Sequence, residues 1–68
     1  MGADFPRVLI PSETAVYLRL SERQLRRLRT AGRGPRWMDI GGCVRYLEAD
    51  LRAWQVELEA QTLRGDRQ

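Results

Sequence analysis

The segment from Ser21 to Gly32 constrains the fold more than any other part of the chain, because it combines a helix start, a helix end and two opposed faces. Ser21 suits the N-cap position, since its hydroxyl can accept a hydrogen bond from a free backbone N–H in the first turn. Gly32 can adopt the left-handed conformation that ends a helix. At about 100° per residue, Leu25 and Leu28 point to the same side. The pattern predicts one short amphipathic helix.

The outer face of this predicted helix is almost entirely basic. Its residues, at the spacing i, i+3, i+4 and i+7, are Arg23, Arg26, Arg27 and Thr30. A solvated face usually mixes acids with bases, because like charges at this spacing destabilise a helix by roughly a few tenths of a kcal/mol per pair. Glu22 is the only acid here, and a polyanion would remove the repulsion. A merely solvated face is the simpler alternative, but the pattern favours contact with phosphates and base edges.

The basic charge is concentrated in one part of the chain. The net charge is +3, yet residues 7–45 carry nine arginines against three acids, whereas residues 46–68 carry three arginines against five acids. The basic part contains the Arg-rich helix. This asymmetry predicts a polyanion partner on one side of the domain.

The composition argues against several classes of protein. A chain of 68 residues predicts one small domain with a compact apolar core. Cys43 has no cysteine partner and the chain has no histidine, so we expect neither a disulfide nor a metal site. No catalytic constellation or phosphate-binding glycine loop is found, so we expect no enzyme activity and no cofactor. We expect no secretory leader or membrane contact, and a cytoplasmic location in a bacterial host cell.

Two segments precede the Arg-rich helix. Residues 1–8 lack periodicity and are expected to form a flexible arm. Pro11 or Ser12 is expected to open a first short helix, because proline suits the first turn and Ser12 can cap it. The connection Arg19–Leu20 is short, so the two helices match a helix-turn-helix unit.

Residues 37–46 are predicted to form a β-hairpin. A three-residue loop, 41–43, would pair Ile40 with Val44 and Met38 with Tyr46, so that these four share one apolar face. A two-residue loop would divide them between both faces. The opposite face would hold the remaining side chains, Trp37, Asp39 and Arg45.

Residues 48–62 are predicted to form the longest helix. Leu47, Leu51, Trp54 and Leu58 give an inward stripe, in which we expect Trp54 to lie in the core. The predicted organisation is therefore a domain over residues 9–62, with a disordered tail at 63–68. The fold class is α+β, mostly helical: a small winged helix-turn-helix with two short helices, a hairpin wing and a longer C-terminal helix.

A series of residues carries a family resemblance through most of the chain. They are Glu13, Ala15, Tyr17-Leu18, Ser21, Leu25, Leu28, Gly32, Pro35, Ile40-Gly41, Val44-Arg45-Tyr46, Asp50-Leu51 and Trp54. In order and spacing, residues 9–58 resemble the small winged helix-turn-helix proteins of the excisionase and MerR-like group. That group includes phage excisionases, also called recombination directionality factors, and AlpA-type prophage regulators.

The resemblance implies a set of DNA contacts. In that group the second helix enters the major groove, and the wing reaches the adjacent minor groove or backbone. By position, the implied major-groove residues are Arg23, Gln24, Arg26, Arg27 and Thr30. Arginine can contact guanine O6 and N7 together, and glutamine suits adenine. The implied backbone and wing contacts are Arg19, Ser21, Arg29, Arg33, Arg36 and Arg45.

Two positions depart from the pattern of the group. Arg19 stands where a glycine usually separates the helices. Either a left-handed residue there costs roughly 1 kcal/mol, or the turn has a different conformation. The wing tip, Gly42-Cys43, lacks the usual basic residue. We therefore expect the second helix to carry more of the recognition than the wing.

The resemblance leaves two DNA-binding roles open. An excisionase would bind and bend attachment-site DNA in several copies and direct an integrase toward excision. A small AlpA-type transcriptional regulator would occupy a promoter with the same surface. A third possibility is a protein-interaction module that binds no DNA. The expected partners are double-stranded DNA, an integrase and further copies of the chain, without a small-molecule effector.

Overall fold

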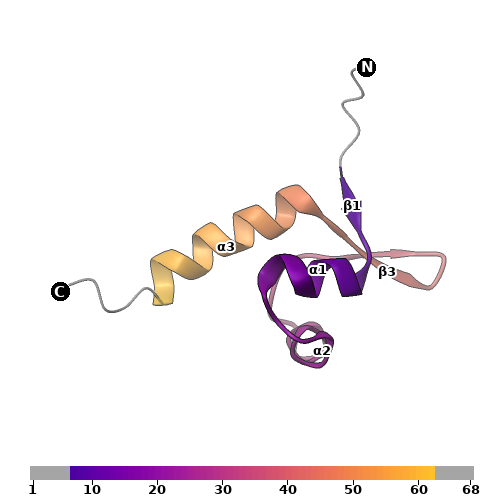
Figure 1. The fold of residues 1–68 in the computed structure, drawn as a ribbon, viewed down its shortest axis with the longest axis horizontal. Helices are drawn as coiled ribbons and strands as arrows, with labels where there is room; N and C mark the ends of the chain where they lie inside the picture. The colour runs from indigo at the N-terminus through magenta and orange to yellow at the C-terminus, as the bar shows by residue number, and fades with distance from the viewer. Residues whose placement is uncertain (1–6, 63–68) are drawn as a thin grey trace, which may run out of the picture.

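The fold combines three helices with a three-stranded antiparallel sheet within residues 7–62, the part of the chain that the computed structural model describes. The elements in chain order are β1 (Val8–Leu9), α1 (Pro11–Leu18), α2 (Glu22–Thr30), β2 (Met38–Ile40), β3 (Cys43–Leu47) and α3 (Glu48–Thr62) (Figure 1). The hairpin β2–β3 is the wing beside a helix-turn-helix. The predicted fold class, a small and mostly helical winged helix-turn-helix, is confirmed.

Strand β1 extends the sheet by one short strand that the sequence did not predict. The strand order is β1-β3-β2, and Val8 pairs with Leu47 while Leu9 pairs with Tyr46. Val8 thus belongs to the sheet, although the sequence placed it in the arm. Two residues are too few to show strand periodicity, and the pairing is set by distant β3. The rest of the expected arm, residues 1–6, and the expected tail, 63–68, lie outside the described residues.

Helix α1 begins at Pro11, as the sequence predicted, but its cap differs. The residue before it, Ile10, occupies the N-cap position in an extended conformation. The backbone N–H of Ile10 donates to the carboxylate of Glu13 at 3.0 Å. Ser12 therefore lies in the first turn of the helix and is not its cap. Buried Thr14 donates its hydroxyl to the Ile10 carbonyl at 3.0 Å, which satisfies a polar group inside the fold.

The turn between α1 and α2 is closed by a left-handed arginine. Arg19 has φ 60° and ψ 40°, so of the two outcomes left open by the sequence, a left-handed residue and a different turn, the structure has the left-handed residue. Its N–H donates to the carbonyl of Val16 at 3.1 Å, and the N–H of Leu20 donates to that of Ala15 at 2.8 Å. This pair of hydrogen bonds commonly ends a helix, and the left-handed residue that allows it is usually glycine.

We predict that Arg19→Gly raises the free energy of unfolding by roughly 0.5–1 kcal/mol. The left-handed conformation costs a non-glycine residue about 1–2 kcal/mol, and glycine removes this cost. The larger entropy of glycine in the unfolded chain offsets about 0.4–1 kcal/mol of the gain. Urea unfolding followed by circular dichroism measures the change. Arg19→Ala is the control, because it removes the side chain and keeps the penalty. An equal gain from alanine would contradict the explanation.

Helix α2 has both of its predicted end signals. The Ser21 hydroxyl accepts from the backbone N–H of Gln24 at 3.0 Å, which confirms the N-cap. Gly32 has φ 73°, its N–H donates to the carbonyl of Arg29 at 3.1 Å, and the N–H of Arg33 donates to that of Leu28 at 2.8 Å. The helix is therefore fixed at both ends by local hydrogen bonds.

The register predicted for the hairpin is wrong. Ile40 pairs with Cys43, Asp39 with Val44, and Met38 with Arg45, so the loop contains only two residues. Those residues, Gly41 and Gly42, have φ 59° and 86°.

Turn chemistry explains the observed register. Two positive φ angles define the tight turn whose twist best matches antiparallel strands, and glycine adopts them without strain. The N–H of Gly42 also donates to the Asp39 carboxylate at 2.8 Å. The apolar residues are consequently divided between the faces, as expected for a two-residue loop. Val44 and Tyr46 point inward, while Ile40 near the tip is 53% exposed.

Tyr46 occupies the centre of the core, and Trp54 does not. The buried cluster contains Leu9, Ala15, Leu25, Tyr46 and Leu51, drawn from β1, α1, α2, β3 and α3. Trp54 is only half-buried, so its predicted core position is wrong. It lies beside the loop Gly34–Pro35–Arg36, where these residues line a shallow hollow together. The core ends near Leu51, and α3 continues beyond it (Figure 1).

Candidate nucleic-acid interface

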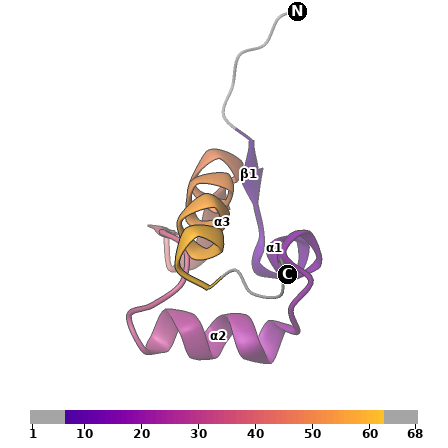
Figure 2. The same cartoon turned by 90° about the vertical axis from the view of Figure 1, so that its left-hand side faces the viewer.

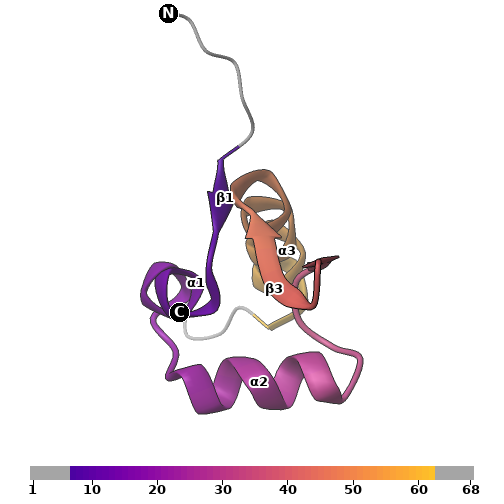
Figure 3. The ribbon, with the colours of Figure 1, turned by 90° about the vertical axis from the view of Figure 1, so that its right-hand side faces the viewer.

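Helix α2 forms one edge of the molecule. Figures 2 and 3 show it running along that edge, with α1, the sheet and α3 all on its other side. Leu25, 1% exposed, is its one fully buried residue. Leu28 and Arg29 are half-buried, and all other side chains of the helix are exposed. The outer face of α2 is therefore open to a large partner.

Three arginines dominate this outer face, which we call the arginine face: Arg23, Arg26 and Arg27. With Thr30 and Ala31 they line a shallow hollow along the helix. Within residues 7–62 the one ion pair is Arg7–Glu48, at 3.9 Å, so none of the three has an acidic partner there. The structure thus brings together four of the five predicted major-groove residues. Unpaired guanidinium groups on an exposed helix are suited to phosphates and guanine edges.

Two of the predicted base contacts are already engaged in hydrogen bonds within α2. The side-chain carbonyl of Gln24 accepts from the backbone N–H of Ser21 at 2.9 Å, which completes a capping box. The hydroxyl of Thr30 donates to the carbonyl of Arg26 at 2.7 Å. Gln24 can therefore offer its amide N–H groups, but a two-bond contact with adenine requires release of the cap.

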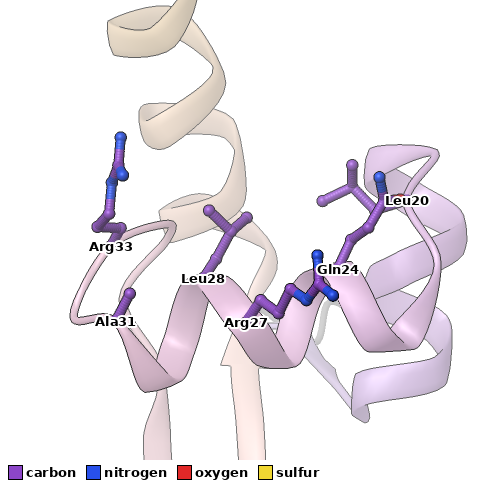
Figure 4. Close-up of a pocket in the computed structure, with 6 residues that line it drawn as sticks. All are labelled: Leu20, Gln24, Arg27, Leu28, Ala31 and Arg33. Atoms are coloured by element: carbon purple, nitrogen blue, oxygen red, sulfur yellow. The ribbon is translucent and has the colours of Figure 1, made fainter.

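Gln24 also lies on a different side of α2 from the arginine face. It lines a second hollow whose other residues are Leu20, Arg27, Leu28, Ala31 and Arg33. Figure 4 shows Leu20, Leu28 and Arg33 pointing to the side of α2 on which α3 lies. Arg27 lines both hollows, so it lies where the arginine face meets this apolar side.

Arg29 is engaged within the fold. Its Nη1 donates to the hydroxyl of Tyr46 at 3.0 Å, and its guanidinium carbon lies 5.8 Å from the centre of the Trp37 ring. These contacts tie α2 to β3 and to the start of the wing. They favour a positioning role over the backbone contact expected from the sequence, because a guanidinium held between two aromatic side chains is less available to DNA.

We predict that Arg29→Gln weakens sequence discrimination without changing the salt dependence of DNA binding. The substitution removes the link between α2 and Tyr46, so base contacts lose alignment while phosphate contacts persist. Arg33→Gln is the matched control. Because Arg33 is expected to contact a phosphate, its replacement should reduce the magnitude of the slope of log K against log salt by about 0.9. Binding isotherms at several salt concentrations measure both slopes. A reduced slope for Arg29→Gln would instead make Arg29 a phosphate contact.

The predicted backbone contacts lie mostly at the two ends of α2. Arg19 and Ser21 precede the helix, while Arg33 and Arg36 follow it in the loop that leads to the wing. Arg33 and Arg36 line a hollow together with Arg29, Gly32, Gly34, Pro35 and Trp37. Positive charge therefore extends beyond both ends of the arginine face. This distribution is suited to contacts with the DNA phosphates on either side of a groove.

The wing carries little positive charge at its tip. Gly41 and Gly42 have no side chains, and the exposed neighbours are Ile40 and Cys43. Arg45 is half-buried, and its Nη1 donates to the carbonyl of Val44 at 2.7 Å. The wing tip therefore presents fewer cationic groups than the outer face of α2.

Sequence reasoning did not assign Trp37 and Tyr46 to this interface. Both act through Arg29, which lies four residues after Leu25 and so shares its side of α2. The spacing of four residues from Leu25 could have indicated that Arg29 faces inward. The partners of Arg29, Trp37 and Tyr46, lie at the base of the wing, and only the folded chain brings them beside α2.

Two further observations concern residues 7–62. No group of three or more His, Cys, Asp or Glu side chains in this range could hold a metal ion. None of the helices described is long and apolar enough to span a bilayer.

Comparison with known proteins adds one finding. The sequence model of a family described as "helix-turn-helix domain" matches residues 8–57, which is well over half of the chain. No curated protein matches the sequence. The matched range includes α2, the wing and the core, and it supports sequence-specific binding to double-stranded DNA.

Proposed function

Because the chain belongs to the helix-turn-helix domain family, we propose that it is an excisionase. In this role it binds and bends attachment-site DNA in several copies and directs a phage or mobile-element integrase toward excision, in the cytoplasm of a bacterial host cell. The observation that carries the proposal is the arginine face, Arg23, Arg26 and Arg27, exposed and without acidic partners within residues 7–62.

Base recognition is assigned to the arginine face placed in the major groove. Each guanidinium spans the O6 and N7 acceptors of a guanine, a contact that discriminates against the wrong base by about 1–3 kcal/mol. Thr30 contributes its oxygen as an acceptor, and Gln24 its amide N–H groups. Backbone contacts are assigned to the cationic and hydroxyl groups at the helix ends and in the wing, Arg19, Ser21, Arg33, Arg36 and Arg45.

Multiple copies follow from the size of the reading surface. Helix α2 has nine residues, and a helix of this length contacts only a few successive base pairs. Several copies on adjacent sites give the specificity that one copy lacks. They can also hold the DNA in a bend, which costs on the order of 1–6 kcal/mol and is offset by the added contacts.

The first test is a salt-titrated binding isotherm on DNA that flanks the gene of this protein, including any attachment site, against random DNA. We expect preferential, stepwise binding to the flanking DNA. Four arginine–phosphate contacts per copy predict a slope of log K against log salt of roughly −3 to −4. Equal and weak binding to both DNAs would contradict the proposal and favour a protein-interaction module.

The second test separates excision from transcriptional control. Recombination in vitro with the neighbouring integrase should shift toward excision when the protein is added, and a fluorescence-based bending measurement should show a bend. Arg23→Ala combined with Arg26→Ala is the control variant, because both side chains are exposed and distant from the core. Specific binding at a promoter with no bend and no effect on excision would instead identify an AlpA-type regulator.

A further inference from the structure

The C-terminal half of α3 is an exposed helix that no other part of residues 7–62 covers. Every residue from 55 to 62 is exposed. Figure 1 shows this half extending away from α1, α2 and the sheet. Val56 is 63% exposed and Leu58 is 38% exposed. A helix of two turns without packing is marginal in water, so an apolar contact here would stabilise it.

One face of α3, from residue 52 to residue 59, carries opposite charges at its two ends. Arg52, Gln55, Val56 and Glu59 recur at i, i+3, i+4 and i+7, and they line a shallow hollow with Leu58 and Thr62. Seven residues separate Arg52 from Glu59, which is about 10 Å along the axis. We call this surface the α3 face. It has a cation at its N-terminal end, an anion at its C-terminal end and an apolar side chain between them.

The α3 face is complementary to itself in the antiparallel direction. A reversed copy sets its Glu59 against Arg52 and its Arg52 against Glu59, and the two Val56 side chains meet near the twofold axis. A parallel copy would instead bring like charges together at both ends. Neither Arg52 nor Glu59 has an ion-pair partner among residues 7–62. The charge pattern thus selects both the partner and its orientation.

We propose that the α3 face binds the α3 face of a second copy of this chain in antiparallel orientation. DNA is a poor occupant, because α3 carries four acids, Glu48, Asp50, Glu57 and Glu59, against one arginine. Two turns of helix offer far less than the roughly 800 Å² per partner of a standard interface. Pairing is therefore weak in dilute solution and becomes strong when two copies are held close together, as on one DNA molecule.

Charge reversal tests the pairing without DNA, so its result is independent of the proposed excision role. Sedimentation equilibrium of the full chain, up to about 1 mM, detects even millimolar association. Arg52→Glu and Glu59→Arg should each weaken self-association by about tenfold, because each replaces two attractive contacts by two repulsive ones. An equimolar mixture of the two variants should associate at least as well as the wild type, because every altered side chain then faces an opposite charge.

Disulfide trapping tests which surface is used. In a Cys43→Ser background, Val56→Cys should cross-link to its counterpart under mild oxidation faster than Gln61→Cys, which is exposed and lies about 140° around α3 from Val56. Circular dichroism checks that all variants keep the wild-type helix content. Equal trapping rates, or single charge reversals that associate as the wild type does, would overturn the proposal.

Discussion

Replacement of Tyr46 by alanine is expected to remove a large part of the free energy of unfolding of the domain. Tyr46 is 1% exposed and lies in β3, where it pairs with Leu9 and packs in the core with Leu25 and Leu51. Removing a large aromatic side chain from a core costs about 3–5 kcal/mol. A chain of this length has a total stability of roughly 3–10 kcal/mol. The substitution therefore removes much or all of the free energy of unfolding.

Far-UV circular dichroism and urea unfolding measure this effect, and two variants serve as controls. Tyr46→Phe keeps the ring and removes only the hydroxyl that accepts from Arg29, so it should cost about 1 kcal/mol. Trp54→Ala should cost less than Tyr46→Ala, because Trp54 is only half-buried. If Tyr46→Ala and Tyr46→Phe unfold at the same urea concentration, Tyr46 does not hold the centre of the core.

Arg27→Ala is expected to weaken binding to the preferred DNA site by about 1–3 kcal/mol and binding to random DNA by much less. Arg27 lies on the arginine face, is exposed, and lines both hollows of α2. A guanidinium that spans two acceptors of one guanine contributes only where that guanine is present. The loss should therefore depend on sequence.

Selection from a random DNA library supplies the preferred site, and isotherms on that site and on scrambled DNA supply the two free energies. Arg36→Ala is the matched comparison, because Arg36 lies in the loop after α2 and its proposed contact is with the DNA backbone. It should weaken binding to both DNAs equally and lower the salt slope by about 0.9. Equal losses for Arg27→Ala on both DNAs would make Arg27 a phosphate contact as well.

The helices could be predicted because their signals are local. The cap at Ser21, the left-handed Gly32 and the apolar spacing of Leu25 act within one or two turns, and the structure contains all three. The bounds of the helix over residues 48–62 followed in the same way from its acids and its apolar stripe. The left-handed Arg19 was only one of two outcomes that the resemblance left open, because glycine usually stands at this place in the resembled group.

The errors concern contacts between distant segments. Apolar alternation suggested a three-residue wing loop, but the glycine pair and the Asp39 carboxylate set a tighter turn. Strand β1 forms by antiparallel pairing with β3, which is distant in the sequence. Trp54 had the spacing of a core residue, yet the core ends one turn earlier. Arg29 belonged to the basic series in sequence, and only the folded chain places it beside Tyr46.

Helix α2 assigns its two tasks to separate residues, and this has a consequence for how the protein can change over generations. Leu25, Leu28 and Arg29 are the buried and half-buried residues of the helix, whereas the arginine face is exposed and is not part of the buried cluster. Substitutions on that face can therefore alter the DNA site while the folding stability stays nearly constant. A lineage of such proteins can acquire new target sites by a few point mutations, without a compensating change elsewhere.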